Sequence, residues 1–110
     1  MASSPLHEVV TDQFRAVFML GAEDEVDSVE NVDVEVYLSD GTRWSATFMT
    51  MREIEKIMDR WRSSGENSGG RYFRSGDLVI VREAGISAMV QTMESALADG
   101  GPYSILTPLG

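Results

Sequence analysis

The sequence predicts a small α+β domain in which one sheet carries helices on one of its faces. Residues 32–48 alternate apolar and polar side chains on either side of Asp40-Gly41, as an antiparallel hairpin with one buried face does. Residues 51–62 and 86–97 instead carry apolar residues at helical spacing. We predict the element order (α)ββαββα, with two antiparallel hairpins in one small sheet. At 110 residues the chain has the length of a single domain, 1–110.

The first segment of the chain fits two descriptions. Ser4-Pro5 is a favourable helix opening, and Phe14 and Phe18 are among apolar residues at helical spacing up to Gly21. The β-branched residues between Leu6 and Leu20 also suit a strand. We predict a helix here, and we expect residues 1–5 to be disordered.

Residues 22–31 are crowded with carboxylates and lack an apolar period, so we predict a solvated acidic loop. A calcium loop needs oxygen ligands at set spacing and a glycine for its turn. The stretch from Glu23 to Glu30 has no glycine and no such spacing, so a connector is the favoured interpretation.

The register of the first hairpin follows from its alternation. A two-residue turn at Asp40-Gly41 would set the valines of residues 32–36 opposite polar side chains. A three-residue loop, 39–41, with Gly41 in the left-handed conformation, instead pairs Val36 with Trp44 and Val34 with Ala46. We predict the three-residue loop.

A helix begins at Met51. Thr50 and Glu53 have the spacing of a capping box, and Gly65 follows the last apolar residue of the stripe, Trp61. The helix is therefore predicted to end at residues 63–65.

A second hairpin and a last helix complete the predicted unit of residues 32–98, and an apolar tail follows it. Residues 71–74 and 78–82 are predicted to form the second hairpin around Ser75-Gly76, with Arg74 facing Asp77. The apolar run 78–81 suggests a central strand. A last helix ends at Gly100-Gly101, and the apolar tail, 99–110, either packs across the domain or reaches a second subunit.

Composition excludes several kinds of chemistry. The chain has no cysteine and one histidine, which excludes thiol catalysis and multi-histidine metal sites, and we expect no metal and no cofactor. The net charge of −9 disfavours nucleic acid and favours a basic protein partner. No apolar run could span a bilayer and the first residues do not resemble a secretory signal, so we expect a cytoplasmic protein.

Five residues are candidates for binding a ligand or partner: Trp44, Arg71, Tyr72, Arg74 and Asp77. Each also has a structural interpretation. The arginines and aromatic residues of 71–74 suit core packing with solvated charged ends, Trp44 suits an anchor of the core, and Asp77 suits a turn residue paired with Arg74. No residue is predicted to be catalytic.

Four strings together resemble a group of small uncharacterised bacterial proteins. They are 33–41, 44–48, 70–73 and 77–81, and the likeness covers about residues 30–98. It implies a bacterial cytosolic origin and a shared fold. None of the strings is a catalytic signature, so the resemblance implies no activity.

Two functions remain open at this stage. The first is a non-enzymatic protein-binding module, such as an accessory or immunity-type inhibitor that masks a basic partner. The second is a homodimeric small-molecule-binding protein or enzyme with a pocket between sheet and helices, lined by Trp44, Arg71 and Tyr72. The acidic first half, with a charge of −8 over residues 1–50, favours the first.

Overall fold

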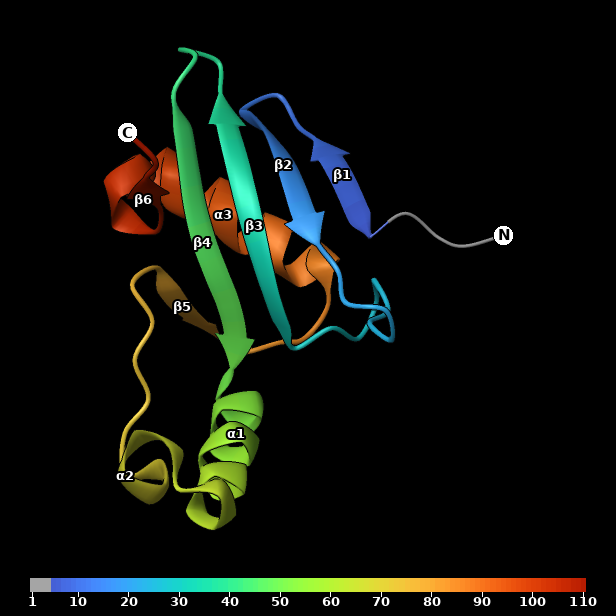
Figure 1. The fold of residues 1–110 in the computed structure, drawn as a ribbon. Helices are drawn as coiled ribbons and strands as arrows, with labels where there is room; N and C mark the ends of the chain where they lie inside the picture. Colours follow the sequence, from blue (N-terminus) through green and yellow to red (C-terminus); the bar gives the residue numbers. More distant parts are fainter. Residues whose placement is uncertain (1–4) are drawn as a thin grey trace.

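The computed structural model describes residues 5–110, and it confirms a small α+β fold (Figure 1). The strands are β1 (Leu6–Val10), β2 (Phe14–Met19), β3 (Asn31–Leu38), β4 (Arg43–Thr50), β5 (Leu78–Val81) and β6 (Thr107–Pro108). The helices are α1 (Met51–Ser64), α2 (Glu66–Gly70) and α3 (Ile86–Gly100), and η1 (Pro102–Ser104) is a short 3-10 turn.

The six strands form one sheet in the order β1-β2-β3-β4-β5. Neighbouring strands are antiparallel except β4 and β5, which are parallel. β6 shares the outer edge of β4 with β5, since it pairs at Trp44 and Ser45 while β5 pairs at residues 47–50. Strand β4 is therefore paired along both edges.

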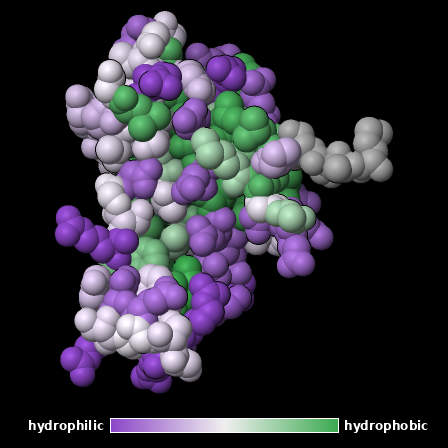
Figure 2. All heavy atoms as spheres, viewed as in Figure 1, coloured by the Kyte–Doolittle hydropathy of each residue, from purple (hydrophilic) through white to green (hydrophobic). Residues whose placement is uncertain are grey.

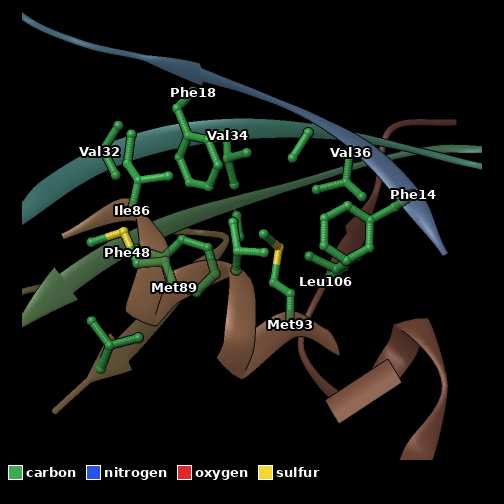
Figure 3. Packing of buried hydrophobic residues seen from close by; sticks show 14 of the residues in the cluster. Phe14, Phe18, Val32, Val34, Val36, Phe48, Ile86, Met89, Met93 and Leu106 are labelled. Atoms are coloured by element: carbon green, nitrogen blue, oxygen red, sulfur yellow. The ribbon is translucent and has the colours of Figure 1, made fainter. Parts of the chain in front are cut away.

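Helix α3 crosses one face of this sheet and closes the core against it (Figure 3). Its buried residues include Met89 and Met93, which lie against side chains from β2, β3 and β4. The labelled core side chains of the sheet and tail are Phe14, Phe18, Val32, Val34, Val36, Phe48 and Leu106. Alternate residues of each strand thus supply the sheet side of the core.

The first hairpin and the start of α1 follow the sequence predictions. Val36 pairs with Trp44 and Val34 with Ala46, and the loop of residues 39–41 has Gly41 at φ 85°. This confirms the three-residue loop. The hydroxyl of Thr50 accepts a hydrogen bond from the Glu53 amide at 3.2 Å, so the predicted cap of α1 is also confirmed.

The predicted first helix is wrong, because residues 6–19 form strands β1 and β2. Phe14 and Phe18 are four residues apart, a spacing that both helical and alternating patterns satisfy. The alternation decides the outcome: it buries Phe14, Ala16 and Phe18 against α3, and β3 provides the pairing edge. Of the residues predicted to be disordered, 1–4 lie outside the described residues, and the Pro5 carbonyl accepts a hydrogen bond from the Leu20 amide at 2.7 Å.

The predicted second hairpin is also wrong. Residues 71–77 form no strand, and β5 pairs in parallel with β4 instead of with a neighbour in sequence. The reason is that β4 offers an unpaired edge, and the long connection through α1 and α2 lets the chain return in the same direction. β5 is therefore an edge strand, and Ile80 is 54% exposed, whereas the sequence suggested a central strand.

Helix α1 does not cover the sheet, contrary to the prediction that the helices share one face. Figure 1 shows α1 and α2 extending beyond the end of β4. In this projecting unit, which we call the arm (residues 51–74), the ring of Phe73 stacks on that of Trp61 with centroids 5.6 Å apart. The apolar stripe of α1 thus packs within the arm.

Two segments remain: the acidic loop connects two strands, and the C-terminal tail covers part of the core. Residues 20–30 join β2 to β3 without regular structure, which confirms the predicted acidic loop apart from Asn31, the first residue of β3. The tail packs across its own domain: Leu106 is buried in the core, and Tyr103 lies edge-on to Trp44 at 4.9 Å.

Gly85, directly before α3, packs closely against the backbone of the acidic loop, and substitution of this glycine tests the contact. Its amide donates to the Val29 carbonyl at 2.8 Å, it has φ 95°, and an added Cβ would lie 2.7 Å from the Asp27 carbonyl oxygen. We expect Gly85→Ala to lower the free energy of unfolding by about 2–4 kcal/mol, because it combines backbone strain with a backbone clash. Urea denaturation followed by circular dichroism measures this.

Gly41→Ala is the matched control, since Gly41 also has positive φ but has no atom near an added Cβ. It should cost about 1 kcal/mol from backbone strain alone. Equal losses in the two variants would contradict the role assigned to the close approach at Gly85.

Candidate functional site

One face of the sheet has no helix over it, and this open face is the candidate site. Strands β1 to β4 alternate, so every second residue points away from α3. The outward residues of these strands are Leu6, Glu8, Val10, Arg15, Val17, Met19, Asn31, Asp33, Glu35, Tyr37, Arg43, Ser45, Thr47 and Met49, of which Thr47 and Met49 are buried. Figure 2 views the molecule from this side, where hydrophobic and hydrophilic residues lie next to each other.

A chain of polar contacts crosses the first three strands. The guanidinium of Arg15 lies 2.8 Å from the Glu8 carboxylate on β1 and 4.3 Å from the centre of the Tyr37 ring on β3. The Tyr37 hydroxyl in turn donates to Glu35 at 2.8 Å, and this hydrogen bond is the main reason that the pKa of Tyr37 is raised. Arg15 is thus held from both sides, and its contacts link β1, β2 and β3 on the open face.

A second polar group joins β3, β4 and the start of β5. Asp77 accepts hydrogen bonds from the hydroxyls of Ser45 at 2.8 Å and Thr47 at 2.7 Å, and the Asp77 carbonyl accepts from the Thr47 amide at 2.9 Å. The Thr47 hydroxyl also lies 2.7 Å from the Asp33 carboxylate. A hydroxyl has one proton, so it can donate to only one of the two carboxylates at a time.

The charge state of Asp77 reflects these contacts. Burial alone would raise its pKa, but the hydrogen bonds from Thr47, Ser45 and its other donors outweigh that effect, and the pKa lies below the usual value of 3.8. Asp77 is therefore ionised at neutral pH and holds the beginning of β5 against β4.

Exposed apolar side chains gather on β1 and β2. Leu6 is 54% exposed, Val10 69% and Met19 40%, and Val17 lies between them on the same face. We call these four residues the apolar patch. Glu8 lies within it and Glu35 is paired with Val17 in the strand register, so carboxylates border the apolar surface.

The structure separates the residues proposed from the sequence. Trp44 is buried beneath Tyr103 at the start of β4, whereas Arg71, Tyr72 and Arg74 belong to the arm beyond the other end of that strand. They do not line one pocket. Asp77 is bonded to hydroxyls, and within residues 5–110 it has no ion pair with Arg74, so the predicted pairing of the two is wrong.

Sequence reasoning missed the apolar patch because it predicted a helix there. The available signal was the run of β-branched residues Val9, Val10 and Thr11 together with the alternation of Phe14, Ala16 and Phe18. A strand interpretation would have put Val10, Arg15, Val17 and Met19 on one face.

No feature of the described residues indicates bound metal, and comparison with known proteins adds no assignment. Among residues 5–110, no group of three or more histidine, aspartate or glutamate side chains could hold an ion. No helix in that range is long and apolar enough to cross a membrane. No family model matches the chain, and no curated protein or solved structure is significantly similar to it.

The contribution of Asp77 can be measured as a function of pH. Asp77→Asn should lower the free energy of unfolding by about 1–3 kcal/mol at pH 7, since charge-assisted hydrogen bonds are weakened. The folded pKa is depressed, so the contribution is complete above pH 3.8 and is lost as the pH falls through the folded value. Chemical denaturation at pH 7, 5, 3.5 and 2.5 measures the difference between the two proteins.

The two unfolding curves should converge at the lowest pH values, where the wild-type carboxyl is protonated. A difference that stays constant from pH 7 to pH 2.5 would contradict the ionised role of Asp77. Asp99→Asn is a suitable control, because Asp99 is an exposed residue of α3 that makes no side-chain hydrogen bond to another described residue.

Proposed function

We propose that this protein is a non-enzymatic protein-binding module that binds a basic partner on its open face, in the manner of an accessory or immunity-type inhibitor. The observation that carries the proposal is the apolar patch on an uncovered sheet face, with carboxylates at its border. Apolar side chains surrounded by charged ones are typical of surfaces that bind other proteins.

The apolar patch supplies the affinity in this proposal. A buried valine, leucine or methionine side chain contributes about 1.5–3 kcal/mol relative to an exposed one. Leu6, Val10 and Met19 are all at least two fifths exposed, so each has surface to lose to a partner. The polar contacts of Arg15 hold the neighbouring side chains in place, which lowers the entropic cost of binding.

In this proposal the negative charge of the first half of the chain makes the protein selective for a basic partner. Residues 1–50, which include β1 to β4 and the acidic loop, carry a charge of −8. On the open face itself Glu8, Asp33 and Glu35 are near the patch, and Glu8 alone of the three is in an ion pair among the described residues. A basic protein would be attracted to this half of the molecule and would bind more weakly at high salt.

A matched pair of variants tests the proposal. Val10→Lys with Met19→Lys places two charges in the apolar patch. Met51→Lys with Leu109→Lys makes the same change in net charge at two exposed apolar residues outside the patch. Affinity capture from a lysate of the native host, with quantitative mass spectrometry, should enrich one basic protein with the wild type and the control but not with the patch variant.

Titration calorimetry with that protein in purified form completes the test. We expect the patch variant to bind at least about tenfold more weakly, and the control to stay within about twofold of wild type. The proposal fails if no protein distinguishes the wild type from the patch variant, or if the captured protein is acidic or binds both variants alike.

A further inference from the structure

The arm has a charge opposite to that of the rest of the chain. Residues 51–74 contain six basic and four acidic residues, a charge of +2. The rest of the chain therefore carries −11, which gives the net charge of −9. Arg52 and Lys56, near the root of the arm, form ion pairs with Glu30 and Glu53. The excess positive charge therefore lies farther out.

The outer part of the arm, residues 57–74, contains two acidic residues, Asp59 and Glu66, and four arginines, a charge of +2; the arginines are Arg60, Arg62, Arg71 and Arg74. The rings of Trp61 and Phe73 are stacked, which holds their two segments next to each other. Each ring is a sequence neighbour of an arginine, so arginines of the two segments are brought close together. All four arginines are exposed, and none has an ion-pair partner within residues 5–110. We call this group the cationic tip.

The acidic loop has the complementary property. Glu23, Glu25 and Asp27 are exposed, and none of them forms an ion pair with another described residue. Backbone hydrogen bonds hold the loop in place, among them those from the Ser28 and Val29 amides to the Glu25 carbonyl. The loop thus presents three uncompensated carboxylates on an ordered backbone.

The loop and the arm leave the sheet at the same end. Asn31, where the loop meets β3, is paired with Met49, next to the residue that caps the arm. Figure 1 shows the loop next to the ends of β2 and β3 and the arm extending beyond the end of β4, both at the same end of the sheet. The pair of Arg52 with Glu30 at 2.9 Å already joins the roots of the two within one chain.

We propose that two copies of this chain pair about a two-fold axis, each placing its cationic tip on the acidic loop of the other. A two-fold axis near the shared end of the sheet makes the two contacts equivalent and closes the assembly. Tyr72, half exposed beside the tip, adds an aromatic surface of the kind enriched at interfaces. The dimer contact uses the loop and the arm and none of the outward residues of the strands, so the dimer does not depend on the proposed function.

Measurement of mass in solution tests the pairing. Size-exclusion chromatography with light scattering, from 5 to 500 µM in 50 mM NaCl, should show the wild-type mass rise from 12.1 kDa towards twice that value. Raising NaCl to 500 mM should shift the equilibrium back to monomer, because contacts between exposed charges are screened.

Charge exchange identifies the contact. The tip variant is Arg71→Glu with Arg74→Glu, and the loop variant is Glu23→Lys with Glu25→Lys. Each alone should self-associate at least about tenfold more weakly, since both reciprocal contacts become repulsive. An equimolar mixture should dimerise again, because the basic tip of one meets the acidic loop of the other and the reversed pair is also attractive.

Arg43→Glu with Gln13→Glu and Gln91→Glu is the matched control, with the same net charge as the tip variant and all three changes at exposed residues outside the arm and the acidic loop. It should dimerise as the wild type does, and circular dichroism should show all variants folded. A wild type that is monomeric at 500 µM in 50 mM NaCl overturns the proposal. So does a tip variant that still dimerises, or a mixture that stays monomeric.

Discussion

The packing of helix α3 on one face of the sheet is the contact on which the rest of this molecule depends. It buries alternate residues of β2, β3 and β4, and the others lie on the opposite face, where all but Thr47 and Met49 of β4 are at least partly exposed. No second helix layer covers those outward residues, because α1, the other long helix, extends away from the sheet as part of the arm. The open face, with its apolar patch and its polar contacts, is the consequence of having one helix for a two-sided sheet.

Strand β4 joins the parts that surround this core. It pairs with β3 on one edge and with β5 and β6 on the other, and its last residue caps the arm. A crossover between parallel strands usually packs its helix on the sheet. Here Asp77 binds the hydroxyls of Ser45 and Thr47 and holds the returning strand directly, so the helix of the crossover is free to project.

Acidic and basic residues are concentrated in different segments of the chain, and the fold places these segments at different parts of the surface. Eight of the ten acids of the first fifty residues lie on the open face or in the loop between β2 and β3, while four arginines without an ion pair among the described residues lie in the outer part of the arm. Arg71, Tyr72 and Arg74 belong to that tip, away from Trp44, which serves the core. Charge and aromatic character in the sequence selected these residues as candidates, but did not reveal which of the candidates lie close together in the fold.

The sequence by itself determined the elements whose signals are local. The hairpin of β3 and β4 follows from two alternating strands and a glycine able to adopt φ 85°, and the start of α1 follows from a hydroxyl that caps its own helix. The tertiary structure decided the rest. Residues 6–19 became strands because β3 offered an edge and α3 covered alternate side chains, and β5 joined β4 across a long connection. These pairings join residues distant in sequence, so local spacing does not encode them.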